Sequence, residues 1–330
     1  MRLKQVSRDA LTVRRVRHGR GHAYLDAEGN TWPRGELRER ALHLGIPPAW
    51  TEVRVAPEPN MHIQACGLDA AGRVQYIYHA DWEARRTRKK QRQLALLTAA
   101  LPRIRRHVAS DLAAETGSRT LALAIGVALI DRTAMRIGRE RYLDASGTRG
   151  AGTLYSRDVS VKADEITVNF PAKSGKHAQY TLTDARLAAA IARVKTIPGK
   201  RLLMYRDEAG KARAIRSEEL NRYLREIAGT PVTAKDFRTL HASAMAAEAL
   251  ARIEPGESAT ARKRQLAAVT KQVASFLRNT PAITRASYIA PCLFSLFEKA
   301  KLSDLWATVD GRDGLRAREA RLAAVLEHVA

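Results

Sequence analysis

The sequence is poor in cysteine and in long hydrophobic runs. Its 330 residues include two cysteines, Cys66 and Cys292, which cannot form a disulfide framework or a zinc cluster. The longest apolar run, Leu121–Ile130, is half of the roughly 20 residues that cross a bilayer, so we expect no transmembrane helix. The first residues (MRLKQVSRDA) contain no apolar segment, so we expect no secretory signal. Together these absences predict a cytoplasmic protein.

The sequence has far fewer acidic than basic side chains. The chain carries 57 Lys and Arg residues against 34 Asp and Glu, a formal net charge of +23 with a pI near 10.6. So large an imbalance indicates a polyanionic partner, and nucleic acid is the usual candidate. Residues 1–85 carry 13 basic and 10 acidic side chains, whereas residues 86–330 carry 44 and 24. We therefore expect the second part of the chain to make most of the contacts with that partner.

Motifs for nucleotide and metal binding are also missing. The sequence has no GxxxxGK[ST] phosphate-binding loop, no HExxH, no CxxC pair and no DxDxDG calcium loop. Its carboxylates are scattered, without the clustered acids that hold two metal ions in nucleases and polymerases. We therefore expect no cofactor and no metal. A basic enzyme that acts on DNA without these parts needs a side-chain nucleophile, and Arg and Lys to handle the phosphate charge.

The residue pattern changes near residue 85, where we place a hinge. The first 80 or so residues contain short alternating stretches between Gly, Asn and Pro, which predicts a β-rich region. Six basic residues follow in 85–92, and 94–108 then has helical periodicity. We predict an N-terminal domain of residues 1–85 and a catalytic domain of residues 86–330.

The second domain is predicted to be mainly helical. The apolar segment 119–135 predicts a buried helix. Three runs rich in Thr, Val and Tyr predict a small antiparallel sheet, namely 153–155, 165–170 and 179–182. Helical patterns follow at 184–196, 217–228, 234–252, 259–278, 281–300 with a break at Pro291, and 312–329. The predicted fold class is α+β.

Four segments contain residues suited to chemistry on a phosphodiester. They are 134–142 (AMRIGRERY), 168–176 (VNFPAKSGK), 233–240 (TAKDFRTL) and 273–289 (VASFLRNTPAITRASYI). In this order they resemble the type IB DNA topoisomerases, in the small poxvirus-type and bacterial branch. Segments 61–67 (MHIQACG) and 72–79 (GRVQYIYH) resemble the same family, so the similarity covers roughly residues 20–300. The resemblance implies the catalytic fold that this family shares with the tyrosine recombinases.

The resemblance implies a role for each catalytic residue. Tyr288 would be the nucleophile that takes the 3′-phosphate of the cut strand. Arg136 and Arg238 would bind the non-bridging oxygens of the scissile phosphate, and Lys173 would protonate the departing 5′-oxygen. Asn279 stands where poxvirus members carry His, and its neutral amide can donate a hydrogen bond but cannot act as an acid or base.

Other positions stay open between two interpretations. Lys176 competes with Lys173 for the role of general acid, because both flank the same turn; alignment on Phe170 favours Lys173. Gln75, Tyr76 and Tyr78 are either DNA contacts, as the resemblance implies, or residues that pack in a sheet. Ala172 and Arg278 depart from the family, whose members usually carry Gly at these two places.

The proposed chemistry explains these residue types independently. The hydroxyl of a solvated tyrosine has a pKa of about 10, so it needs nearby positive charge to attack at neutral pH. Arg forks match a phosphodiester that gains charge in its transition state, and the leaving alkoxide needs a proton donor. A phosphotyrosyl ester keeps the energy of the broken bond, so resealing needs no ATP.

Two alternatives remain. A tyrosine recombinase shares the Arg, Lys, Arg and Tyr set, but it usually carries His three residues before the second Arg, where this chain has Lys235. A non-enzymatic basic DNA-binding protein would explain the charge but not the four segments. We expect a monomer that closes as a clamp around duplex DNA and is associated with the nucleoid.

Overall fold

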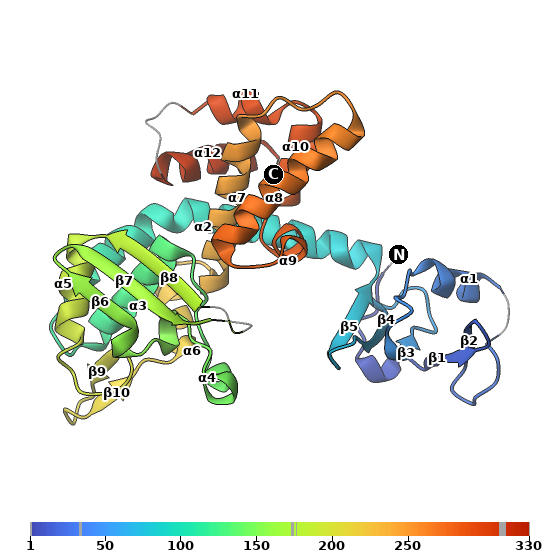
Figure 1. Cartoon of the computed structure of the whole chain (residues 1–330), viewed down its shortest axis with the longest axis horizontal. Helices are drawn as coiled ribbons and strands as arrows, with labels where there is room; N and C mark the ends of the chain where they lie inside the picture. Colours follow the sequence, from blue (N-terminus) through green and yellow to red (C-terminus); the bar gives the residue numbers. More distant parts are fainter. Residues whose placement is uncertain (1, 33–34, 173–174, 176, 310–314, 330) are drawn as a thin grey trace. The chain divides into compact units, whose positions relative to one another are not determined.

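Strands dominate the first part of the chain and helices the second (Figure 1). The computed structural model describes residues 2–32, 35–172, 175, 177–309 and 315–329. The chain forms two compact units that divide between Lys89 and Lys90. Helix α2 (Ala80–Asp111) runs without a break through residue 85, close to this division, and the hinge expected there stays a prediction. Its run of Arg, Lys and Gln is compatible with a helix because these residues are good helix formers. The boundary of the two domains remains a prediction.

The first unit is built on one antiparallel sheet with the strand order β2 (Gly21–Leu25), β1 (Val13–His18), β3 (Thr51–Val55), β4 (Ile63–Leu68) and β5 (Val74–Tyr78). Strand β4 is buried over most of its length, and Val55, Ala65 and Cys66 have no exposed surface. The β-rich character predicted for this region is confirmed. The unit also contains a 3₁₀ turn η1 (Arg8–Ala10) and helix α1 (Glu36–His43).

Two helices form the centre of the second unit. The side chains that α2 buries are spaced three and four residues apart, as its periodicity predicts: Leu94, Leu97, Leu101, Ile104 and Val108. Helix α3 (Arg119–Thr133) is buried on nearly all sides, so the buried helix predicted at 119–135 is confirmed. The Ser118 side chain caps its N-terminus, and the helix ends at Ala134 in the left-handed conformation with φ 51°.

A small antiparallel sheet lies against helix α5 (Ala185–Val194). Its strands are β6 (Val159–Lys162), β7 (Glu165–Pro171) and β8 (His177–Thr183), in that order. The strand expected at 153–155 is wrong, because Ala151–Thr153 is a 3₁₀ turn (η2) and Tyr155 makes only an isolated bridge. The backbone of this turn is bonded to the segment that follows α3 and is not available to the sheet.

Helix α7 (Ala234–Ala251) contacts α8 (Ala259–Leu277), α10 (Pro291–Glu298), α11 (Leu302–Ala307) and α12 (Leu315–His328). The α+β fold class is confirmed. The break expected at Pro291 is confirmed, because one helix ends at Ser287 and the next begins at Pro291, whereas α4 (Glu140–Ser146) and α11 were not expected. Residues 312–314 of the last expected helix lie outside the described residues. Other elements are η3 (Ser156–Asp158), β9 (Met204–Arg206), β10 (Ala212–Ala214), α6 (Ser217–Ala228) and α9 (Pro281–Ser287).

No helix among the described residues is both long enough and apolar enough to span a bilayer.

Candidate active site

Four of the five catalytic candidates come together in the second unit. Arg136 follows α3, Arg238 lies on α7, Asn279 lies between α8 and α9, and Tyr288 ends α9. Arg136 donates to Asn279, and the Arg238 guanidinium carbon lies 5.0 Å from the centroid of the Tyr288 ring. The fifth candidate, Lys173, and its competitor Lys176 lie outside the described residues.

The backbone around Arg136 is fixed by a close approach of two chain segments. The N–H of Ala151 donates to the carbonyl oxygen of Arg136 over 2.9 Å. A Cβ atom on Gly150 would lie 2.3 Å from that oxygen, and one on Gly138 would lie 2.3 Å from Oγ1 of Thr153. Real side chains do not fit at such distances, so both positions require glycine. Arg136 therefore extends from a segment that has little freedom to move.

Arg238 joins the ends of two helices. Its side chain is 3% exposed, with Nη1 donating to Ala134 O over 2.5 Å and Nη2 to Leu277 O over 2.9 Å. Both carbonyls lie at helix C-termini, where the helix dipole favours a cation. The third donor, Nε, is buried and has no hydrogen-bond partner among the residues that the structure describes.

The oxygen and the nitrogen of the Asn279 side-chain amide differ in their hydrogen bonding. Its Oδ1 accepts a hydrogen bond from Nη2 of Arg136. Its Nδ2 is buried and finds no acceptor in the described part of the chain. Helix α9 is capped instead by the side chain of Thr280, which accepts from the N–H of Ile283. Asn279 is therefore not the helix cap, and its free N–H group belongs to the site.

Tyr288 is half-buried beside the cationic residues. Burial of the hydroxyl opposes ionisation, but the positive charges of Arg238, Arg136 and Lys235 outweigh it and hold the pKa of Tyr288 below its ordinary value. The backbone at this position is held by Ser243, whose Oγ donates to Tyr288 O over 3.2 Å and accepts from Ala290 N over 3.0 Å.

Two lysines next to the tyrosine were not among the candidates from the sequence. The Nζ atom of Lys235 lies 6.0 Å from the centroid of the Tyr288 ring. Nζ of Lys90, on α2, donates to Ile289 O over 3.1 Å. Burial and then the charge of Lys235 lower the pKa of Lys90 to about 8. In the sequence, Lys235 could have been singled out by its position three residues before Arg238. Lys90 could not, because it is one of six basic residues in 85–92.

Comparisons with known proteins show the family of the chain. The catalytic core of eukaryotic DNA topoisomerase I, as a family, matches residues 79–290, a range that contains all four site residues. The N-terminal domain of bacterial DNA topoisomerase IB matches residues 21–69. The chain belongs to the type IB DNA topoisomerases. It is therefore an isomerase, and the resemblance found in the sequence is confirmed.

Viral relatives match most of the topoisomerase. DNA topoisomerase 1B of Acanthamoeba polyphaga mimivirus is 30% identical over 267 residues, which are 79% of this chain and 80% of that protein. DNA topoisomerase 1B of Vaccinia virus (strain Copenhagen) is 21% identical over 269 residues, covering 80% and 82%. DNA topoisomerase I of monkeypox virus matches to the same extent.

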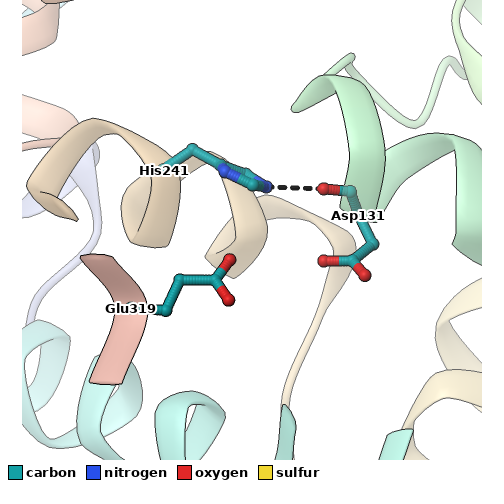
Figure 2. Close-up of side chains that lie close together, drawn as sticks. All are labelled: Asp131, His241 and Glu319. Atoms are coloured by element: carbon teal, nitrogen blue, oxygen red, sulfur yellow. Dashed lines mark hydrogen bonds between the residues drawn. The ribbon is translucent and has the colours of Figure 1, made fainter. Parts of the chain in front are cut away.

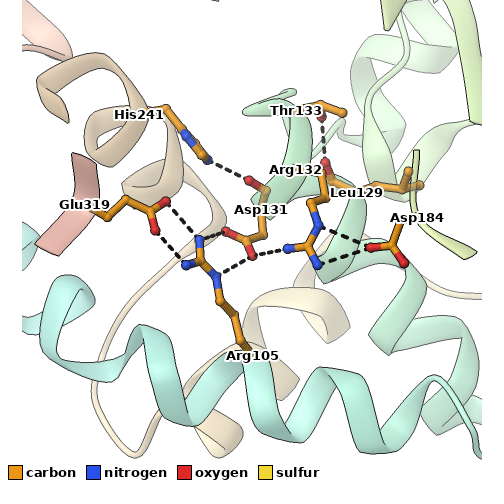
Figure 3. Close-up of polar contacts among 8 residues, drawn as sticks. All are labelled: Arg105, Leu129, Asp131, Arg132, Thr133, Asp184, His241 and Glu319. Atoms are coloured by element: carbon orange, nitrogen blue, oxygen red, sulfur yellow. Dashed lines mark hydrogen bonds and ion pairs between the residues drawn. The ribbon is translucent and has the colours of Figure 1, made fainter. Parts of the chain in front are cut away.

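A buried polar cluster lies beside the active site of the topoisomerase. Figure 2 shows Asp131, His241 and Glu319, whose possible ligand atoms all lie within 4.8 Å of one another. Figure 3 shows why this set does not suit a metal ion: the guanidinium of Arg105 already lies between the two carboxylates. It donates to Asp131 over 2.8 and 2.9 Å and to Glu319 over 2.6 and 2.9 Å.

The charges of this cluster are mutually compensated. Burial alone would raise the pKa of Asp131, but hydrogen bonds and charge from Arg105 hold it below its ordinary value. Burial lowers the pKa of His241, whose Nε2 donates to Asp131 O over 2.7 Å (Figure 2). Arg105, Asp131, His241 and Glu319 thus join α2, α3, α7 and α12 directly behind the helix end that leads to Arg136.

The DNA-contact candidates of the N-terminal unit lie on β5. The side-chain amide of Gln75 donates to Asp69 over 2.8 Å. Tyr76 is 40% exposed and stacks on Tyr78 with 5.9 Å between ring centroids. The guanidinium of Arg86 lies 5.1 Å from the Tyr78 ring. The aromatic rings form a partly exposed surface, and their contact with DNA remains a prediction.

Proposed function

We propose that this topoisomerase relaxes supercoiled duplex DNA by cutting one strand through a 3′-phosphotyrosyl intermediate, letting the free end swivel and resealing it without ATP. One observation carries the proposal: two buried N–H donors that have no hydrogen-bond partner among the described residues lie around Tyr288. They are Nε of Arg238 and Nδ2 of Asn279. A buried donor without an acceptor is costly, and the oxygens of a bound phosphate would supply acceptors.

The cleavage step uses these groups around one phosphate. The hydroxyl of Tyr288 gives its proton to solvent water and its oxygen attacks phosphorus, so a bond forms between Oη and the 3′-phosphate. The bond from phosphorus to the 5′-oxygen breaks, and that oxygen takes a proton from Lys173. Resealing is the reverse, with the 5′-hydroxyl attacking and Tyr288 leaving. The number of phosphate ester bonds is unchanged, so no ATP is required.

The remaining residues stabilise charge. Arg136 and Arg238 bind the non-bridging oxygens, which gain negative charge in the transition state. Asn279 supplies a neutral hydrogen bond from Nδ2, because its Oδ1 is already engaged by Arg136. The lowered pKa of Tyr288 supports its role as nucleophile, since the cations that favour the phenolate are already in place.

We also propose that a monomer holds duplex DNA as a clamp. The net charge of the chain is concentrated in residues 86–330, which supports phosphate tracking by this part. The N-terminal unit would add contacts through Gln75, Tyr76 and Tyr78, and in the second unit Lys176 would touch the DNA backbone. We place this activity on nucleoid DNA in the cytoplasm.

The test is incubation of the purified protein with supercoiled plasmid in EDTA and without ATP. We expect stepwise relaxation to a ladder of topoisomers. Strand exchange limited to particular sites would assign the chain to recombination instead, and a mobility shift without any relaxation would leave it a DNA-binding protein. Either result would overturn the proposal.

A further inference from the structure

Arg278 ends helix α8 in an unusual backbone conformation. Its φ of 53° and ψ of 48° lie in the left-handed region, where a side chain is strained and glycine is favoured. Its N–H closes the helix by bonding to Ala274 O and Ser275 O. Strained residues of this kind persist where the surrounding structure holds them, and they gather at functional sites.

The side chain of Arg278 binds the edge of the three-stranded sheet. Strand β8 lies at the end of the strand order, so one of its sides has no strand neighbour among the described residues. Nη1 of Arg278 donates to His177 O over 3.1 Å, and Nη2 donates to Gln179 O. The guanidinium carbon also lies 4.9 Å from the centroid of the Tyr180 ring. The several N–H donors of the guanidinium allow it to bond two carbonyls of the strand at once.

Three consecutive residues at the C-terminal end of α8, namely Leu277, Arg278 and Asn279, each form hydrogen bonds with a different part of the second unit. The carbonyl of Leu277 accepts from Arg238 on α7, and the side chain of Arg278 holds β8. The amide of Asn279 accepts from Arg136, beyond the end of α3. The Arg278 side chain therefore opposes a shift of β8 away from this junction, in addition to the burial of Ala178 in the core.

We propose that Arg278 is a positioning residue that fixes the β7–β8 hairpin against the Arg136–Asn279 pair. The inference rests on the proposed function, in which the segment joining β7 to β8 supplies the general acid. A misplacement of about 1 Å in a reacting group can slow a reaction by roughly 10²-fold. Without the two hydrogen bonds from Arg278, strand β8 is held less firmly against the phosphate-binding residues, and proton transfer to the 5′-oxygen slows.

Arg278→Gly and Arg278→Lys test the role directly. Glycine relieves the backbone strain and removes the fork, so loss of activity would not reflect a misfolded helix end. Lysine keeps the charge but cannot hold both carbonyls, so we expect partial rescue. Arg264→Ala removes one exposed positive charge from the same helix and serves as the matched control.

Single-turnover cleavage is measured on ordinary DNA and on DNA with sulfur at the bridging 5′-position, a leaving group that needs no proton. We expect Arg278→Gly to be at least roughly 10-fold slow on ordinary DNA and close to wild type on the sulfur-bridged strand. Arg136→Ala should stay slow on both. Equal slowing of Arg278→Gly on both substrates, or no slowing on either, would overturn the proposal.

Hydrogen exchange separates this inference from the proposed function. If Lys173→Ala and Lys176→Ala both stay slow on the sulfur-bridged strand, the assignment of a lysine acid fails. The role of Arg278 is then decided by amide exchange in β8, which we expect to be faster in Arg278→Gly than in the wild type and Arg264→Ala, while β6 is unchanged. Unchanged exchange in β8 would contradict the inference, whatever the cleavage rates.

Discussion

Replacing Glu319 with glutamine removes one of the two carboxylates that enclose the guanidinium of Arg105. Glu319 is 3% exposed and accepts two hydrogen bonds from Arg105, over 2.6 and 2.9 Å. Removing one partner of a buried ion pair costs about 3–5 kcal/mol, because the other charge stays buried. Glutamine keeps the volume and one acceptor oxygen, and Asp131 still pairs with Arg105. We therefore expect a loss at the lower end, about 3 kcal/mol of unfolding free energy.

The assay is urea and thermal unfolding followed by far-ultraviolet circular dichroism, which reports mainly on the helices of the second unit. A loss of this size lowers the melting temperature by roughly 6–12 °C, since each kcal/mol shifts it by about 2–4 °C at this domain size. Glu327→Gln, an exposed position on the same helix, is the control and should change stability by less than about 0.5 kcal/mol. If Glu319→Gln costs no more than this control, the cluster does not hold α12 in place and the reasoning is refuted.

Three further changes test the site. Lys90→Met removes an ammonium whose pKa is lowered to about 8, against about 10.4 in an unfolded chain. The folded wild type therefore loses its proton before the unfolded chain does, and its stability relative to the variant should rise between about pH 8 and 10. A difference in urea unfolding that does not change with pH would contradict this. Gly150→Ala places a methyl group 2.3 Å from Arg136 O and should destabilise the protein and slow single-turnover cleavage, whereas Gly21→Ala, with nothing nearer than 4.0 Å, should do neither. Lys173→Ala should cleave ordinary DNA roughly 10²-fold slowly and sulfur-bridged DNA near the wild-type rate, with Lys176→Ala mild on both; the reverse pattern assigns the acid to Lys176.

Local sequence patterns were sufficient to predict most helices and strands of the fold. The spacing of Leu94, Leu97 and Leu101 reports a helix face, because burial repeats with the helical period. The expected strand at 153–155 failed for a non-local reason: its backbone bonds to the segment near Arg136, which no local pattern reveals. The change in charge near residue 85 lies within a continuous helix, because Arg, Lys and Gln are good helix formers, so composition alone does not locate the division between the two units.

The site depended more on contacts across the chain. The order of the motifs was sufficient to predict Arg136, Arg238, Asn279 and Tyr288 as site residues. The orientation of the Asn279 amide could not be predicted, because it depends on a hydrogen bond from Arg136, 143 positions away. The sequence does not distinguish Lys90 from the other basic residues around it. Its hydrogen bond to Ile289 O appears only in the folded structure.

The central claim is that Tyr288 forms the covalent bond to DNA. The most direct measurement is to stop plasmid cleavage with detergent in EDTA, digest the protein and identify the residue attached to the 3′-phosphate. The account predicts a single adduct at Tyr288 in the wild type, and in Tyr288→Phe no adduct and no relaxation while DNA binding is nearly unchanged. An adduct formed by the Phe variant, or attachment to a 5′-phosphate, would contradict it.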